Sequence, residues 1–211
     1  MVLRRSICQI LSTACLLFLA VPLVAQEVDA RLKKEAQALF RVAMADKQAP
    51  QACQYDDRWR SSAQFPREYA QEFFGFRLRS NLAAFVPLDA PNKEFVDPEG
   101  KYPSAFCSKE DAVKASKDRL EEFKAGTEKS LSIVRDDFSF PIFDAHYTKA
   151  VIIRSNSVRN WSVRSVDGVQ GGWGSSVTAH GYVKSNGIWR EAKDWYIQGG
   201  HGPLRSPQQQ E

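Results

Sequence analysis

The chain has 211 residues, of which 43% are hydrophobic and 26% are charged, a balance that is typical of globular proteins and excludes a disordered or collagen-like chain. Arg4 and Arg5 contribute to the formal net charge of +4, and the chain after residue 25 carries 27 basic and 25 acidic residues. A dedicated nucleic-acid binder usually has a larger and more clustered basic excess. We therefore expect no nucleic-acid partner.

Residues 1–25 are typical of a secretory signal peptide. The basic start is followed by an apolar stretch from Ala14 to Ala25, and Leu23-Val24-Ala25 offers a small-residue cleavage site before Gln26. The alternative is an uncleaved membrane anchor, but roughly 20 apolar residues are needed to cross a bilayer and Ser12 and Thr13 interrupt a longer window. We expect cleavage, a periplasmic or secreted location, and no transmembrane segment in the mature protein.

The cysteine positions agree with export. Cys8 and Cys15 belong to the leader, which leaves Cys53 and Cys107 as an even pair in a compartment that permits disulfides. The alternative is a nucleophilic or metal-bound thiolate. Neither residue lies in a C-x-x-C motif, and no histidine lies within thirty residues of either. The sequence predicts a Cys53–Cys107 disulfide.

Three helices are expected first. Apolar residues at spacings of three and four predict an amphipathic helix over residues 27–47. A second helix begins at Pro66 and continues through Phe85, and the proline-rich residues 87–106 form a loop. Ser108 and Asp111 resemble a capping box, which starts a third helix that ends at Gly126.

Short strands come next, over residues 131–135, 148–155, 176–184 and 188–197. Asn186-Gly187 predicts a two-residue hairpin turn in which Ser185 faces Ile188 and Lys184 faces Trp189. The glycine-rich residues 168–174 are expected to form a mobile loop or a tight bend.

The predicted fold class is therefore α+β, with three N-terminal helices packed on a C-terminal antiparallel sheet of about four strands. A single domain covers residues 26–205, and residues 206–211 form a disordered tail.

Aromatic residues are concentrated in the predicted sheet. Trp189 and Trp195 are six residues apart, so in an unbroken strand they share one face, and we expect both in the core. Trp173 is flanked by glycines, which predicts an exposed indole that can recognise a ligand. Arg159 and Arg164 surround Trp161, and this basic segment is either a solvated strand edge or a contact for an anionic partner. The candidate binding residues are Trp173, Trp161, Arg159 and Arg164.

The histidines and acids give weaker predictions. No histidine belongs to a metal-binding motif, and no nucleotide or other cofactor motif is present, so we expect no metal and no cofactor. His180 is a candidate general base if a cleft brings it to Asp194 or Asp144, and otherwise it is a partly buried strand histidine. The acid pairs Asp56-Asp57 and Asp136-Asp137 are expected in solvated loops and turns.

Several short motifs carry a resemblance. Ser139-Phe140-Pro141-Ile142-Phe143, the glycine cluster around Trp173, and Asn186-Gly187-Ile188-Trp189 resemble the C-terminal part of secreted bacterial proteins of uncharacterised function. The resemblance covers residues 131–197 and implies an envelope or secreted location, with no catalytic residue to carry over. The order of helices and sheet is also similar to cone-shaped folds of the nuclear-transport-factor-2-like type, and this likeness is topological only.

These patterns support two functional hypotheses. The first is an exported, non-catalytic binding protein of the inhibitor, immunity or envelope-interaction type, whose partner is a protein or a cell-envelope polymer. The second is a small periplasmic hydrolase or isomerase with a pocket between the helices and the sheet, in which His180 is the base. A structural module without a small-molecule site is a third possibility.

Overall fold

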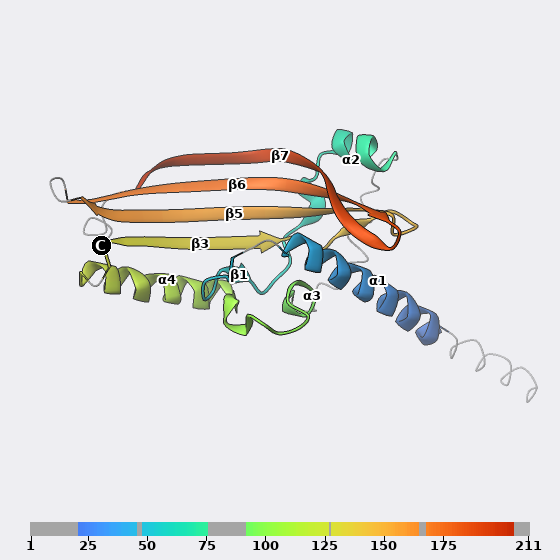
Figure 1. Cartoon of the computed structure of the whole chain (residues 1–211), viewed down its shortest axis with the longest axis horizontal. Coiled ribbons are helices and arrows are strands. Elements are labelled where there is room, and N and C mark those ends of the chain that lie inside the picture. Colours follow the sequence, from blue (N-terminus) through green and yellow to red (C-terminus); the bar gives the residue numbers. More distant parts are fainter. Residues whose placement is uncertain (1–20, 46–47, 76–91, 127, 165–167, 205–211) are drawn as a thin grey trace, which may run out of the picture.

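The computed structural model describes residues 21–45, 48–75, 92–126, 128–164 and 168–204. These residues form four α-helices and one seven-stranded sheet, with the helices mostly in the N-terminal half (Figure 1). The α+β prediction is confirmed, but the expected number of about four strands is wrong. Most of the predicted leader, and the predicted tail at 206–211, lie outside the described residues.

Helices α1, Val21–Ala43, and α2, Arg67–Phe74, begin near their predicted positions, whereas the short helix α3, Lys93–Val96, lies within residues 87–106, which were predicted to form a loop. Helix α1 buries Ala36, Leu39 and Phe40, and Gln37 in its middle donates a hydrogen bond to the Glu94 carbonyl of α3. Helix α2 follows Pro66 and ends at Gly75. The remainder of the predicted second helix, residues 76–85, lies outside the described part of the chain. None of the helices in that part has the length and apolar character needed to span a bilayer.

Helix α4, Lys109–Lys124, begins with the predicted cap. The Ser108 hydroxyl accepts a hydrogen bond from the Asp111 backbone N–H at 3.0 Å, which satisfies one of the free donors of the first turn. Phe123 near the other end packs against Leu131 and Trp161 of the sheet. The helix is thereby held along one side of the sheet beside β3 (Figure 1).

Four long antiparallel strands form most of the sheet. They are β3, Ser130–Phe138; β5, Lys149–Arg164; β6, Gly168–Ser185; and β7, Ile188–Leu204. The short parallel strands β1, Tyr55–Asp56, and β2, Phe106–Cys107, continue the sheet beyond β3, and β4, Ile142–Phe143, pairs with β5. The resulting order is β2-β1-β3-β5-β6-β7.

The glycine-rich residues 168–174 belong to β6, so the prediction of a loop there is wrong. Glycine is needed because indole rings from the adjacent strand lie directly against these backbone positions. A Cβ atom on Gly171 would lie 2.8 Å from Cδ1 of Trp161, and one on Gly202 would lie 2.9 Å from Nε1 of Trp173. The glycines therefore make room for cross-strand tryptophans and do not break the sheet.

The β6–β7 hairpin has the predicted turn. Ser185 pairs with Ile188 and Lys184 pairs with Trp189. Asn186 and Gly187 both have positive φ, at 51° and 79°, as a type I′ turn requires. The register of the last two strands is thus fixed by a local signal.

The sheet has two faces that different helices cover. The α1 face carries Phe138, Ile152 and Tyr182, which pack against α1. The α4 face carries Leu131 and Trp161, which pack against α4, and further along it Val177, Ala179 and Trp195 form a cluster with Phe74 of α2.

A β-bulge in β7 changes which side chains share a face. Gly181 pairs with Lys193 whereas the next residue, Tyr182, pairs with Glu191, so Ala192 is an extra residue in β7. Trp189 and Trp195 are both buried, as predicted, but they belong to different clusters on opposite faces. The prediction of one shared face is wrong because the strand is not unbroken.

The predicted disulfide is present in the structure. Cys53 and Cys107 are bonded with their Cα atoms 4.9 Å apart, at a sequence separation of 54 residues. The bond joins the segment before β1 to β2. Arg135 of β3 donates hydrogen bonds to the backbone carbonyls of both cysteines, which ties the bridged segments to the long strands.

Asp136 is fully buried in β3, so its assignment to a solvated loop is wrong. Its carboxylate accepts hydrogen bonds from Nε and Nη2 of Arg154, at 2.9 and 3.0 Å, and from the side-chain amides of Gln54 and Asn156. A carboxylate without exposure to water requires such compensation. The network joins β3 and β5 to the chain just before β1.

Candidate functional site

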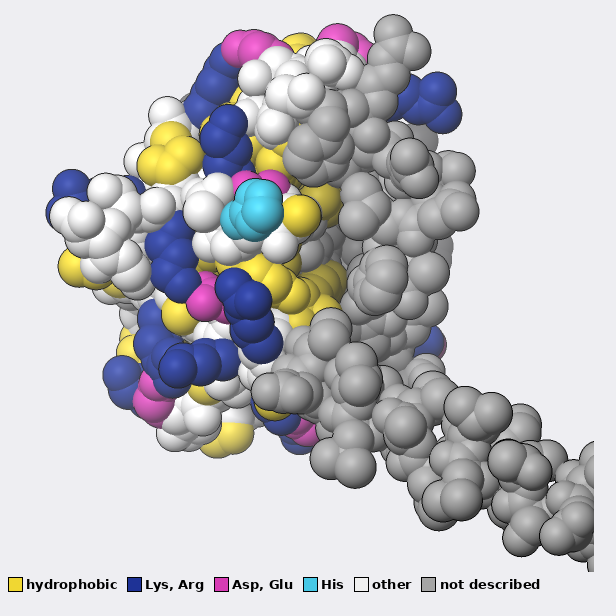
Figure 2. Space-filling view, turned by 90° about the vertical axis from the view of Figure 1, so that its right-hand side faces the viewer, with side chains coloured by type: hydrophobic (Ala, Val, Ile, Leu, Met, Phe, Trp, Pro, Cys, Tyr) yellow, Lys and Arg dark blue, Asp and Glu magenta, His cyan; other side chains and the backbone are white. Residues whose placement is uncertain are grey.

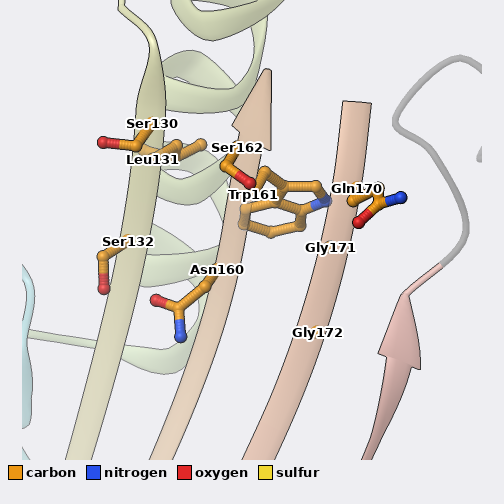
Figure 3. Close-up of a pocket in the computed structure, with 9 residues that line it drawn as sticks. All are labelled: Ser130, Leu131, Ser132, Asn160, Trp161, Ser162, Gln170, Gly171 and Gly172. Carbon is orange, nitrogen blue, oxygen red and sulfur yellow. The ribbon is translucent and has the colours of Figure 1, made fainter. Parts of the chain in front are cut away.

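The α1 face has an uncovered part. Helix α1 packs on the end that carries Ile152 and Tyr182, whereas the face continues along β3, β5 and β6 as an open trough of about 460 Å³. Figure 3 shows its lining from the three strands. The lining residues are Ser130, Leu131, Ser132, Asn160, Trp161, Ser162, Gln170, Gly171 and Gly172. We call this hollow the polar trough.

The polar trough is lined by neutral hydrogen-bonding groups. Three serine hydroxyls and the amides of Asn160 and Gln170 come from alternate positions on neighbouring strands, and therefore project from the same face. None of the lining residues is acidic or basic. Such a surface suits a ligand that is itself uncharged and rich in donors and acceptors.

Trp161 forms the floor of the trough from the opposite face. Its indole is only 3% exposed and packs with Phe123 and Leu131, and its Nε1 has no hydrogen-bond partner among the described residues. Glycine at position 171 is the only residue type that fits over Cδ1 of this ring without displacement. Trp161 therefore shapes the trough, and a direct contact of this indole with a ligand stays a prediction.

Trp173 and Arg159 are neighbours on the α4 face, away from the polar trough. They pair across β5 and β6, and both are exposed, with 40% of Trp173 accessible. The Trp173 ring lies against Gly200 and Gly202 of β7. The backbone of Arg164 ends β5, but its side chain lies outside the described part of the structure. Trp161, Trp173 and Arg159 thus project from the same face of the sheet, but Trp161 is buried under α4, and Trp173 and Arg159 are the exposed members of the three.

His180 lies between two carboxylates on the α1 face. Its Nδ1 is 2.7 Å from Oε1 of Glu191 and 2.8 Å from Oδ1 of Asp194, and 22% of its side chain is exposed. Asp194 lies beside His180, as the hypothesis of a general base requires, whereas Asp144 accepts hydrogen bonds from Thr148. Glu191 was not predicted, because without the bulge it would point to the other face than Asp194.

A second cavity adjoins this histidine. It has a volume of about 150 Å³ and opens between the end of α1 and the sheet, as the hydrolase hypothesis requires of its pocket. Its lining consists of Val42, Ala43, Phe138, Ile152, Arg154, His180, Tyr182 and Glu191. No serine, threonine or cysteine belongs to this lining, so a reaction there would have to use His180, Glu191 or a water molecule as the nucleophile.

Two tyrosines of the core are held in the protonated form. Burial raises the pKa of Tyr182 above the ordinary range, and the negative charges of Glu191 and Asp194 raise it further. Burial, with a smaller contribution from Asp136, raises the pKa of Tyr55 to about 12. Tyr182 at the wall of the cavity is therefore a hydrogen-bond donor and not a base at neutral pH.

The basic side chains at the hairpin end of the molecule are largely engaged. Figure 2 shows Lys and Arg side chains spread over this end. Lys184 pairs with Glu35 at 2.6 Å, Lys193 pairs with Glu72, and Arg31 stacks on the ring of Tyr147. Paired cations of this kind leave little net charge for a phosphate-rich partner.

The chain was compared with protein-family models and with curated proteins, and neither comparison gives a match. A functional proposal for this protein therefore rests on the geometry of the two hollows.

Proposed function

We propose that the protein is an exported, non-catalytic binding protein that holds an uncharged polysaccharide of the cell envelope in the polar trough. The observation that carries the proposal is the trough itself, whose lining has hydroxyl and amide groups and no charged side chain. Acidic or basic polymers need opposite charges on the protein, whereas a neutral glycan presents hydroxyls and amides that match this lining.

The shape of the surface supports a chain-like ligand. From Gln170 the α1 face continues along β6 through Ser176 to Thr178, a distance of about 26 Å at roughly 3.3 Å per residue. Ser176 and Thr178 are partly exposed, and Tyr196 beside Thr178 is 63% exposed. An extended polymer can therefore follow the strands with its hydrogen-bonding groups facing the protein.

The Cys53–Cys107 bond and the leader predicted from the sequence support export, since disulfides persist in oxidising compartments. The hydrolase or isomerase hypothesis has less support, because the cavity beside His180 has a volume of about 150 Å³, whereas small-molecule pockets usually have roughly 300–1,000 Å³.

Calorimetric titration of the chain with the uncharged hexamer of N-acetylglucosamine tests the proposal. The variant Asn160→Ala/Gln170→Ala removes two side-chain amides from the trough, and each lost hydrogen bond costs about 0.5–1.5 kcal/mol, so we expect binding to weaken about tenfold or more.

The matched control is Trp173→Ala, which removes an exposed aromatic group from the opposite face. We expect it to bind the hexamer like the unmodified chain. The proposal is wrong if the unmodified chain does not bind the hexamer, or if only Trp173→Ala weakens binding. The second result would move the binding surface to the α4 face.

A further inference from the structure

We infer that His180, Glu191 and Asp194 form a binding site for a divalent transition metal ion, with Zn²⁺ as the best match. The site is distinct from the polar trough and does not depend on the function proposed for it. On β6, Gly172 of the trough and His180 are eight residues apart, which corresponds to about 26 Å.

The first argument is the donor set. Nδ1 of His180, Oε1 of Glu191 and Oδ1 of Asp194 lie close together, and all three ligand atoms are within 4.8 Å of one another. One imidazole nitrogen with two carboxylate oxygens suits Zn²⁺ and its neighbours, whereas Ca²⁺ and Mg²⁺ prefer oxygen ligands alone.

The second argument is charge. Two carboxylates converge on one imidazole nitrogen, which has at most one proton to donate. In the described part of the chain, neither carboxylate is paired with a Lys or Arg side chain; the nearby guanidinium of Arg154 is bound to Asp136. When His180 is neutral, the group carries two negative charges beside one nitrogen lone pair, a combination that a divalent cation can balance and bind.

The third argument is how the backbone builds the group. His180 and Asp194 are directly paired across β6 and β7, but Glu191 is three residues from Asp194 and would face away in a regular strand. The extra residue Ala192 turns Glu191 to the same face. Bulges are common next to functional sites because they re-aim a side chain in this way.

The fourth argument is that the three side chains can move apart enough to accept an ion. A tetrahedral ion with bonds of about 2.1 Å holds its ligand atoms about 3.4 Å apart, so the present 2.7 and 2.8 Å distances must widen by about 0.6–0.7 Å. The Glu191 and Asp194 side chains are 49% and 59% exposed and are free to move by this amount.

His180 and Glu191 also line the 150 Å³ cavity, which leaves space for a water molecule or a small anion at the fourth position. When Nδ1 of His180 coordinates a metal ion, its lone pair is occupied, and the same atom cannot accept a proton as a general base. Metal binding therefore replaces the hypothesis that His180 is a catalytic base.

Titration of the untagged mature chain, from Gln26 to Glu211, with Zn²⁺, monitored by calorimetry, tests the site, and the visible absorption of bound Co²⁺ reports its coordination. We expect one ion per chain. Glu191→Gln and Asp194→Asn keep the side-chain shapes and should weaken binding at least about 100-fold, because even the outer partners of metal ligands contribute 10–100-fold.

Two controls separate this site from accidental binding. His201→Asn removes an exposed histidine elsewhere on β7 and should leave Zn²⁺ affinity unchanged. Asn160→Ala/Gln170→Ala should also leave it unchanged, so the metal site and the polar trough can fail separately. Absence of Zn²⁺ binding, unchanged affinity in Glu191→Gln and Asp194→Asn, or an equal loss in His201→Asn would overturn the inference.

Discussion

Replacement of Asp136 by alanine is expected to destabilise the protein by about 3–5 kcal/mol. The carboxylate is fully buried and accepts two hydrogen bonds from Arg154 and one each from Gln54 and Asn156. Its removal leaves the Arg154 guanidinium, whose side chain is only 22% exposed, without its partner. This loss is a large part of the 5–15 kcal/mol by which a domain is usually stable.

Urea unfolding monitored by tryptophan fluorescence, with the disulfide intact, measures the effect. The companion variant Asp136→Ala/Arg154→Met removes both charges, and we expect it to regain about 2 kcal/mol relative to Asp136→Ala alone, because the unpaired cation is gone. Asp118→Ala, at an exposed position of α4, is the control and should change stability by less than about 0.5 kcal/mol.

The reasoning is refuted if Asp136→Ala costs less than about 1 kcal/mol, or if the double variant is no more stable than Asp136→Ala alone. Either outcome would mean that water replaces the carboxylate and that the network does not join the strands.

Three further changes test the packing and the charges. Replacement of both Cys53 and Cys107 by serine should lower the free energy of unfolding by about 4 kcal/mol, as expected for a closed loop of 54 residues, and urea titration measures it. Gly181→Ala should cost about 1–3 kcal/mol in thermal unfolding, because the new Cβ would lie 2.8 Å from the Trp195 ring. Burial, and then the charge of Asp56, raise the pKa of Asp137. Protonated Asp137 therefore stabilises the folded state relative to the ionised form; this stabilisation is complete below the unfolded pKa of about 4 and is lost as the pH rises through the folded pKa. Asp137→Asn should therefore raise the urea midpoint at pH 7 and flatten its change between pH 4 and pH 7; an unchanged midpoint contradicts this.

The elements predicted best from the sequence are those with local causes. The Asn186-Gly187 turn requires positive φ at two adjacent residues, and few sequences permit it. The Ser108 cap needs only a hydroxyl beside a free backbone donor. The disulfide was predicted from an even pair of cysteines in a chain with a predicted leader.

The length of the sheet was missed because glycine in a single sequence indicates a break. Gly171 and Gly202 are instead places where an indole of a neighbouring strand needs the space. Likewise, Asp136 was expected in solvent because an acid pair is usually solvated, and its burial depends on Arg154, which lies 18 residues away in the sequence.

Of the functional groups, His180 and Asp194 were named from the sequence, whereas Glu191 and the polar trough were not. The trough consists of serines and amides on three strands, and such residues carry no signal until the register places them side by side. The position of Glu191 depends on the bulge at Ala192, and no local sequence pattern indicates that bulge.

The sequence by itself determined the turn, the helix cap and the bridged cysteines, because each depends on a backbone angle, a neighbouring donor or a cysteine count. The tertiary structure alone decided which face each side chain of β7 occupies, since one extra residue reverses the alternation until the next register shift along the strand. The burial of Asp136 and the approach of two carboxylates to His180 depend on which strands pair. The free energy of a buried or clustered charge is set by its partners, and these partners are brought close by the fold and not by the linear sequence.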